Sequence, residues 1–167
     1  MLLPAQLYRE ELKRKMTTCW YQPKYKYYFL ANYHEIQIGD NADWRRDFVC
    51  VYKNEVIGFF SYSYNEVDRS MGNFGLVSFV DSGTILIRDV LKHIEMMFED
   101  GANRLEFWAV ADNPANKMYL SLMKRYGGRK VCELRQTNYF GGNYHNSCIY
   151  ELLSEDYYKR KEDFNRL

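Results

Sequence analysis

The pattern of hydrophobic and polar positions changes along the chain, and each pattern predicts one kind of element. Between Leu3 and Trp20, apolar residues recur at steps of three and four, with charged residues between them. This spacing predicts an amphipathic helix. Residues 21–46 mix aromatic residues with a proline and a glycine, and they predict only a second short helix or an irregular strand. Beyond residue 46 the pattern becomes that of strands.

Three strand-forming runs follow one another. Residues 47–53 and 56–67 are rich in β-branched and aromatic side chains, and Asn54 and Glu55 separate them. This arrangement predicts a hairpin with a tight turn. Residues 73–80 form the third run, so we expect an antiparallel meander of three strands.

In the remaining chain, helical and strand patterns alternate. The predicted elements are a helix over 84–100, a strand over 104–110, a helix between Asn113 and Gly127, and a hairpin of strands over 129–140 and 144–153. A strand, a helix and a strand in this order imply a right-handed crossover and a parallel strand pair. The last residues, 154–167, are polar and charged, and we expect a partly ordered tail.

Length and charge narrow the class of protein. A chain of 167 residues is about the size of one domain. Because 23 basic residues face 22 acidic ones, no net charge steers the chain toward nucleic acid or an anionic membrane. No apolar run approaches 18 residues and no signal peptide is recognisable, so we expect no membrane span and a cytoplasmic location.

Cysteine spacing bears on metals and redox chemistry. The four cysteines are too far apart in the sequence for a zinc motif or a redox motif. We therefore expect reduced, mostly buried thiols and no bound metal. These residues are Cys19, Cys50, Cys132 and Cys148.

Residues 77–90, "VSFVDSGTILIRDV", form a strand, a turn and the start of a helix. The first turn of a helix leaves backbone N–H groups without partners, and these groups bind anions, most often phosphate. The alternative is that a hydroxyl of Ser82 or Thr84 caps the helix without any ligand. The local sequence leaves both interpretations open.

The residues from Arg104 onward carry a resemblance to a known family. The stretch "RLEFWAVADNPANKMYLSLMKRYGGRKVCELRQTNYFGGNYHNSCIYEL" resembles the closing half of the GNAT superfamily of acetyl-CoA-dependent N-acetyltransferases, and the order of elements agrees from about residue 47 to 153. The resemblance implies an α/β (α+β) domain over 1–167. Its mixed, largely antiparallel central sheet would contain a parallel splayed strand pair, with helices on both faces. It also places residues 1–46 on the acceptor side.

Acetyl-CoA is the cosubstrate that this resemblance implies. The backbone of Val77, Ser78, Phe79 and Val80 would pair with pantetheine, since an opened sheet edge offers unpaired amides and carbonyls. The pyrophosphate would bind at Ser82, Gly83, Thr84 and Ile85, with help from Arg88 or Lys92. Asn113 matches the position whose side-chain amide holds the cosubstrate, and it can equally cap the following helix.

The turn departs from the family pattern. The usual loop is Arg or Gln, two residues, Gly, one residue, then Gly or Ala, whereas this chain has one glycine and no arginine ahead of it. Asp81 would also place a carboxylate near the phosphate. Two alternatives follow: a divergent loop that still binds acetyl-CoA, or a catalytically inactive GNAT-like binding module.

Catalysis in this family is direct attack of a primary amine on the thioester. The resemblance implies that Tyr119 donates a proton to the leaving thiolate, with Tyr126 as second choice; either ring could instead be packing. Glu106 is the first candidate for the general base. It could equally pair with Arg104 or Arg135. Glu66 and His145 are the remaining candidates.

The acceptor would be a small-molecule or peptide amine beside an aromatic-rich surface. The same aromatics could instead form a homodimer interface. Stacking on single-stranded nucleic acid is a further use of aromatics beside lysines, but the balanced charge argues against it. The aromatic residues concerned are Trp20, Tyr21, Tyr25, Tyr27, Tyr28, Phe29, Tyr139, Phe140 and Tyr144.

Overall fold

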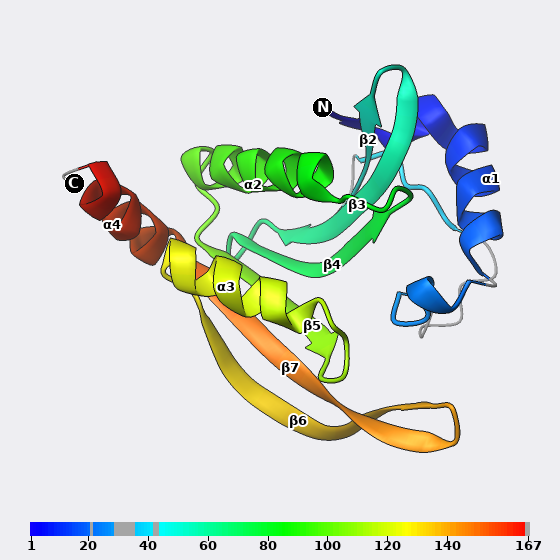
Figure 1. Ribbon diagram of the computed structural model, residues 1–167. Helices are drawn as coiled ribbons and strands as arrows, with labels where there is room; N and C mark the ends of the chain where they lie inside the picture. Colours follow the sequence, from blue (N-terminus) through cyan, green and yellow to red (C-terminus); the bar gives the residue numbers. More distant parts are fainter. Residues whose placement is uncertain (21, 29–35, 42–43, 166–167) are drawn as a thin grey trace. The chain divides into compact units, whose positions relative to one another are not determined.

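The computed structural model describes residues 1–20, 22–28, 36–41 and 44–165 (Figure 1). Two compact units make up the chain. Unit 1 comprises Met1–Tyr64 and Phe74–Asp100, and unit 2 comprises Asn65–Asn73 and Gly101–Leu167. Each is described by itself, and the single domain over 1–167 stays a prediction. Tyr21 and Phe29 lie outside the described residues.

Seven strands form one hydrogen-bonded sheet in the order β1-β2-β3-β4-β5-β7-β6. The strands are β1 (Leu2–Pro4), β2 (Arg45–Tyr52), β3 (Glu55–Asn65), β4 (Ser70–Ser78), β5 (Arg104–Val110), β6 (Arg129–Phe140) and β7 (Asn143–Leu153). The helices are η1 (Ala5–Tyr8), α1 (Arg9–Trp20), η2 (Pro23–Tyr25), α2 (Thr84–Glu99), α3 (Asn116–Tyr126) and α4 (Ser154–Asn165). The sheet is mostly antiparallel, with a parallel β4–β5 pair. The predicted fold class is therefore confirmed.

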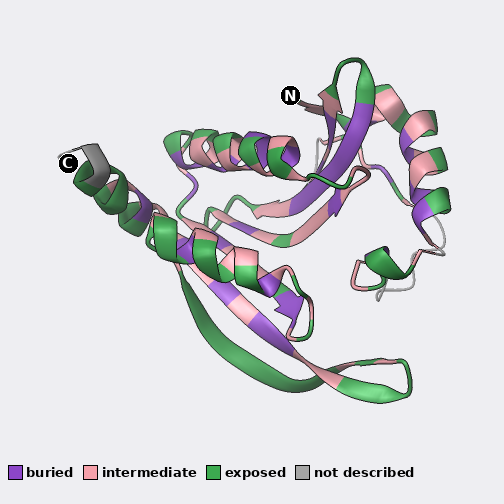
Figure 2. Cartoon of the chain, in the orientation of Figure 1, coloured by how far each residue is buried: buried purple, intermediate pink, exposed green. Residues whose placement is uncertain are grey.

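In unit 1 both faces of the β2–β3 hairpin are buried. Phe59 lies in one hydrophobic cluster with Leu12 of α1. Its neighbour Phe60 points to the other face, where it packs with Phe48 and with His93 of α2. Successive side chains of a strand point to opposite faces, so this alternation places helices on both faces of the sheet. β3 is consequently buried along most of its length (Figure 2).

Both predicted hairpins form. The first turns at Lys53 and Asn54, whose φ values are 49° and 62°, one residue earlier than expected. The second turns at Gly141 and Gly142, with φ values of 58° and 79°. Two consecutive positive φ values are what a two-residue hairpin turn requires, because they match the twist of the strands.

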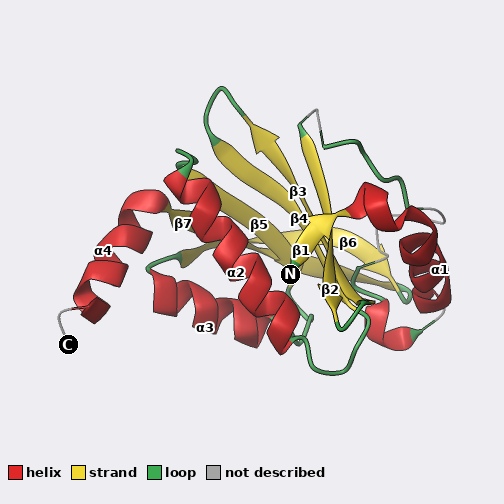
Figure 3. Cartoon of the chain, turned by 90° about the horizontal axis from the view of Figure 1, so that it is seen from above, coloured by secondary structure: helices red, strands yellow, loops and turns green. Residues whose placement is uncertain are grey.

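Two segments differ from the prediction. Residues 2–4 form a short strand, with Leu2 opposite Cys50, instead of the first turn of a helix. Residues 154–165 form the helix α4 where a partly ordered tail was expected, and Figure 3 shows α4 as a regular helix. Tyr157 is buried and stacks on Tyr126 of α3 at 5.8 Å between ring centroids, so this aromatic contact helps to dock a mostly charged helix.

In unit 2 the strands β5, β7 and β6 pair antiparallel. The helix α3 packs on one face of these strands, where its Tyr119 contacts Phe107 of β5 and Tyr150 of β7. β6 is the edge strand and is exposed from Arg129 to Thr137 (Figure 2). Its register with β7 shifts between Leu134 and Asn138. Gln136 in this bulge has a φ of 54°. In the described parts of the chain, no helix is long and apolar enough to span a membrane.

Candidate functional site

The turn between β4 and α2 leaves the helix start open. Within the described residues, no side chain caps α2. The hydroxyls of Ser82 and Thr84 are hydrogen-bonded to each other at 3.1 Å. The first helical hydrogen bond runs from the Ile87 N–H to the Gly83 carbonyl at 2.9 Å. The N–H groups of the first turn are therefore not satisfied by the cap that the sequence offered as an alternative.

Neither the backbone conformation nor the packing of the folded chain requires glycine at position 83. Its φ is −77°, which any residue adopts. A Cβ atom built on it would meet Ser78 only at 3.8 Å, an ordinary contact distance. Glycine is otherwise favoured where the backbone of a protein is approached closely by a ligand.

Asp81 has a cationic neighbour that sequence reasoning missed. Its side chain is fully exposed, and its carboxylate lies 3.6 Å from Nζ of Lys24 in η2. Hydrogen bonding to Tyr25 raises the pKa of Lys24. No local signal could have found this pair, because the two residues are distant in the sequence. Lys24 therefore lies beside the turn and partly offsets the negative charge of Asp81, which would otherwise repel a phosphate.

The backbone predicted to bind pantetheine is partly occupied. The Phe79 N–H donates to the Ile57 carbonyl at 2.9 Å, and the Ser78 hydroxyl donates to the Val80 carbonyl at 2.8 Å. Val77 is buried. The parallel ladder of β4 with β5 ends at Met71, opposite Leu105. The stretch of β4 after Met71 therefore lies beyond that ladder.

Arg88 lies one turn into α2, four residues after Thr84. Its guanidinium is 3.2 Å from the carboxylate of Asp89. Asp89 is buried whereas Arg88 is mostly exposed. Arg88 is therefore already engaged with a carboxylate, although its exposure leaves it able to reach a ligand near the turn.

Asn113 organises the turn before α3 in unit 2. Its side-chain oxygen accepts a hydrogen bond from the Ala115 N–H at 3.0 Å, and its carbonyl accepts one from the Asn116 N–H at 2.9 Å. Because α3 begins at Asn116, Asn113 stabilises the turn ahead of the helix and does not cap the helix itself.

Asn116 was missed by the sequence analysis, although it is the more buried asparagine. Its Nδ2 donates to the Val110 carbonyl at 2.6 Å and to the Ala111 carbonyl at 2.9 Å. Its Oδ1 accepts from the Tyr150 hydroxyl at 2.7 Å. One side chain therefore joins the end of β5 to α3 and β7. Its sequence signal is only a second asparagine in "NPAN", a type that prefers caps to helix interiors.

Tyr119 combines a packed ring with an unbonded hydroxyl. The ring meets Phe107 edge-on, with the centroids 5.1 Å apart, and contacts Tyr150 at 6.0 Å. Burial raises the pKa of Tyr119. Among the described residues its hydroxyl has no hydrogen-bond partner, whereas that of Tyr150 donates to Asn116. Tyr126, the second choice, is instead stacked on Tyr157.

Glu106 belongs to an ion-pair cluster. It pairs with Arg104, which also lies 3.3 Å from the carboxylate of Glu151, and Glu151 pairs with Arg129 at 2.9 Å. Glu106 alternates with Phe107 along β5, so it points away from the face on which Tyr119 packs. The structure does not bring Glu106 and Tyr119 together. Glu66 is exposed in the turn between β3 and β4.

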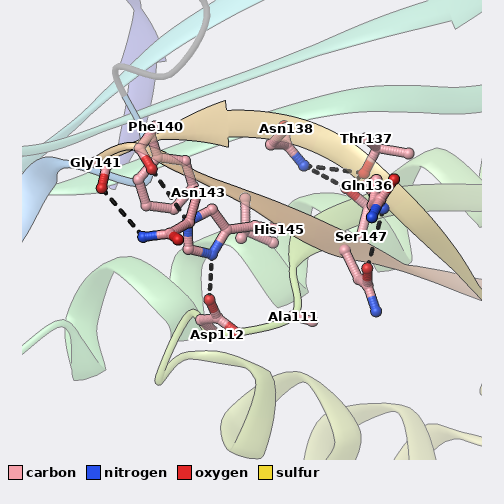
Figure 4. A network of polar contacts seen from close by, with 12 residues as sticks. Ala111, Asp112, Gln136, Thr137, Asn138, Phe140, Gly141, Asn143, His145 and Ser147 are labelled. Carbon is pink, nitrogen blue, oxygen red and sulfur yellow. Dashed lines mark hydrogen bonds and ion pairs between the residues drawn. The ribbon is translucent and has the colours of Figure 1, made fainter.

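His145 has a partner that the sequence did not indicate. Its Nδ1 is hydrogen-bonded to the Asp112 carboxylate, and its Nε2 lies 3.3 Å from the Phe140 carbonyl (Figure 4). The ring stacks on Phe140 with the centroids 3.7 Å apart. Both ring nitrogens therefore face oxygen atoms of the protein, so a substrate could reach either nitrogen only if one of these contacts opened. The arrangement fixes the hairpin to the loop after β5.

A second polar cluster borders this pair on the same hairpin. Asn138 and Thr137 each donate to the Ser147 hydroxyl at 2.8 Å, and the Gln136 N–H donates to Asn146 at 3.0 Å (Figure 4). These hydrogen bonds take the place of the backbone hydrogen bonds between β6 and β7 that the bulge interrupts. The hairpin is therefore held at the bulge by side chains.

The expected aromatic surface divides between core and exterior. Tyr25 is buried in the core of unit 1. Tyr139 and Tyr144 are 65% and 64% exposed and contact each other at 5.0 Å. Among the described residues of this set, Tyr139 and Tyr144 at the hairpin tip are the exposed ones, whereas Trp20, Tyr27, Tyr28 and Phe140 are half-buried.

No metal or redox centre is formed by the described residues. In the parts of the chain that the structure describes, no three His, Cys, Asp or Glu residues are grouped to hold a metal. Cys19, Cys50 and Cys148 are buried thiols and Cys132 is an exposed one. Three of the four thiols are thus buried, as expected, and their reduced state stays a prediction.

No protein-family model matches the sequence, and no curated protein matches it. Solved structures match the fold. The spermidine/spermine N-acetyltransferase SpeG from Vibrio cholerae has a TM-score of 0.59 at 15% identity, over 72% of this chain and 71% of its own. An acetyltransferase from Salmonella typhimurium that modifies the N-terminal serine of ribosomal protein L7/L12 has a TM-score of 0.56 at 16% identity, over 66% and 64%.

A third match is an acetyltransferase of the GNAT family from Chromobacterium violaceum. It has a TM-score of 0.57 at 19% identity, over 69% of this chain and 61% of its own. The chain spans less than two thirds of the length of two of these three relatives. At such low identity the comparison concerns the fold. The chain has the fold of the GNAT acetyltransferases, as the resemblance in its sequence predicted.

Proposed function

We propose that the chain is an N-acetyltransferase that moves the acetyl group of acetyl-CoA to a primary amine. One observation carries the proposal: the start of α2 is uncapped and is preceded by a glycine that the folded chain does not require. Open N–H groups at the positive end of a helix dipole are suited to a diphosphate.

The side chains around the turn fit a diphosphate in part. Lys24 supplies a cation beside Asp81, and Arg88 adds a second one turn along α2. Asp81 remains unfavourable, so the backbone amides of Gly83, Thr84 and Ile85 would contribute most of the binding. The stretch of β4 beyond its ladder with β5 is the edge on which pantetheine would lie.

Bound acetyl-CoA would supply the thioester. The neutral amine attacks the carbonyl carbon, a C–N bond forms and the C–S bond breaks. The hydroxyl of Tyr119 gives its proton to the departing thiolate. Because burial raises the pKa of Tyr119, the phenol stays protonated at neutral pH and can act as the donor. The proton lost by the amine passes to water, and water returns a proton to the Tyr119 phenolate, so the proton count balances.

The acceptor is an amine of a small molecule or a peptide. Spermidine and spermine are named for one structural relative, and the N-terminal serine of a ribosomal protein for another. Both acceptors are primary amines, so they define the class to be screened. The exposed aromatic pair Tyr139 and Tyr144 offers apolar surface for the carbon skeleton of such an amine.

Melting of the full chain with acetyl-CoA and with desulfo-CoA tests the binding step. A ligand that binds only the folded state raises its stability by about 2.7 kcal/mol at a hundredfold excess over Kd. Ser82→Asp should abolish this shift by charge repulsion, whereas the matched Ser82→Asn should keep it. Amines are then screened for release of free CoA thiol.

Two outcomes would contradict the proposal. If neither compound stabilises the chain, acetyl-CoA is not its cosubstrate. If both stabilise it and no amine releases thiol, the chain is the inactive binding module, which the single glycine and Asp81 in the turn would then explain.

A further inference from the structure

A hollow of about 480 Å³ lies in unit 2, where the end of α3 meets the start of β6 and α4. Its apolar lining consists of Leu120 and Met123. Its polar lining is entirely basic and consists of Lys124, Arg129, Lys130 and Arg160. Nothing in the proposed transfer reaction uses these residues.

Two glycines shape this hollow. Gly127 ends α3 with a φ of 89°, a left-handed conformation that favours glycine. A Cβ atom on Gly128 would lie 2.6 Å from the Glu151 carbonyl oxygen and 2.7 Å from Sδ of Met123. Neither position accepts a side chain without a backbone shift. The close packing at these two glycines therefore shapes the floor of the hollow.

The charges around the hollow are incompletely balanced. Lys130 lies 2.7 Å from the carboxylate of Glu133, and Arg129 lies 2.9 Å from that of Glu151. In the described chain Lys124 has no carboxylate partner. Arg129 is 73% exposed, and an ion pair so open to water is easily shared with a ligand. Arg160 adds a fourth cation and has other contacts of its own.

The shape and the charge together select the ligand class. Guanidinium groups bind phosphate through paired N–H donors, and lysine adds a point charge. A hollow of this volume is larger than an inorganic phosphate needs and is in the range of small-molecule sites. The two apolar side chains would contact a ring or an aliphatic segment. The last carbonyls of α3 repel anions, so the binding charge must come from the side chains.

We propose that this hollow binds a small organic phosphate, a molecule with an apolar ring and several phosphate oxygens. The site is separate from the turn before α2, where we place the pyrophosphate of acetyl-CoA. The two sites lie in different units and share no residue.

The test uses ATP as probe, with titration calorimetry on the full chain. Lys124→Gln should weaken ATP binding about tenfold, because it removes one charge-assisted contact. Lys117→Gln is the matched control, since it removes the same charge from an exposed site on the same helix and should leave the affinity unchanged. Inorganic phosphate should bind more weakly than ATP. Ser82→Asp should leave ATP binding intact.

Three results would overturn the inference. The first is the absence of saturable ATP binding, and the second is an equal loss of ATP affinity in Lys117→Gln and Lys124→Gln. The third is a loss of ATP affinity in Ser82→Asp with none in Lys124→Gln, which would place ATP at the turn before α2. Displacement of ATP by a poly-glutamate peptide at matched charge would indicate an acidic protein segment as the occupant instead. Because Ser82→Asp affects acetyl-CoA alone, failure of one proposal is distinguishable from failure of the other.

Discussion

Two helices of this protein follow a strand through a short turn; no described side chain caps either helix, but the two preceding turns are held in different ways. Before α3, the asparagines at 113 and 116 satisfy the turn and the end of β5 with four side-chain hydrogen bonds to backbone groups and to Tyr150. Before α2, the two hydroxyls bond each other and leave the helix start uncapped. Asparagine side chains hold the turn before α3, whereas the turn before α2 has only the hydrogen bond between its two hydroxyls, so the turn before α2 is the candidate for a ligand.

The turn before α3 should be the more sensitive to mutation. Asn116→Ala would leave the buried Tyr150 hydroxyl without its acceptor and take one donor from each of two carbonyls, of which that of Val110 keeps the Asn113 N–H, and it should cost about 2–4 kcal/mol of unfolding free energy. Asn113→Ala, which removes one partly buried bond, should cost about 1 kcal/mol. Urea denaturation measures both. Equal losses would mean that the buried network adds nothing beyond an ordinary turn.

The hydroxyl of Tyr119 should matter for turnover and little for folding. Tyr119→Phe keeps the ring contacts with Phe107 and Tyr150 and removes only the unbonded hydroxyl. Loss of a general acid should lower kcat by about 10²-fold while the melting temperature stays the same. Tyr126→Phe is the matched control and should change neither quantity. An unchanged kcat in Tyr119→Phe would remove Tyr119 from the mechanism.

The turn before α2 should tolerate a methyl group in the absence of ligand. Gly83→Ala should leave the melting temperature almost unchanged, since its Cβ meets Ser78 only at 3.8 Å. The same methyl group would crowd the amides, and the affinity for acetyl-CoA should fall about tenfold, or roughly 1.4 kcal/mol. If Gly83→Ala lowered the melting temperature and kept the full affinity for acetyl-CoA, Gly83 would serve folding and the turn before α2 would not be the ligand site.

A smaller effect concerns α2 and pH. Burial lowers the pKa of His93, whose Nε2 is hydrogen-bonded to the Tyr62 hydroxyl at 2.9 Å. Below the unfolded value of about 6.5, the unfolded chain binds a proton that the folded chain resists. Stability should therefore be constant above neutral pH and decrease as the pH falls below that value. In His93→Phe, the urea midpoint should decrease less as the pH falls. If the midpoint depends on pH as in the unmodified chain, other groups cause the decrease.

Strong local patterns were sufficient for much of the fold. The limits of β5 and β6 agree with the sequence prediction, and α2 ends one residue from its expected end. The segment with β1 was misjudged because helical spacing continues through Pro4, whereas pairing with β2 decides its structure. The helix α4 was missed because its sequence is mostly charged, whereas contacts with distant residues dock it, such as the stacking of Tyr157 on Tyr126 of α3.

The candidate site was harder to predict than the fold. The turn at Gly83 and the ring of Tyr119 follow from local sequence and from the family resemblance. Lys24, Asn116 and Asp112 depend on contacts between residues distant in the chain, and nothing in their own neighbourhoods marks them. Pairing of Glu106 with Arg104, which was an alternative at the outset, is what the structure contains.

The bulge in β6 has a consequence for solubility. An exposed edge strand with apolar side chains such as Val131 and Leu134 would normally recruit further strands and grow into aggregates. The left-handed backbone at Gln136 interrupts the free row of amides and carbonyls at the middle of the strand. The edge can therefore offer only short, misaligned stretches to another chain, and it is protected against sheet extension without a covering helix or loop.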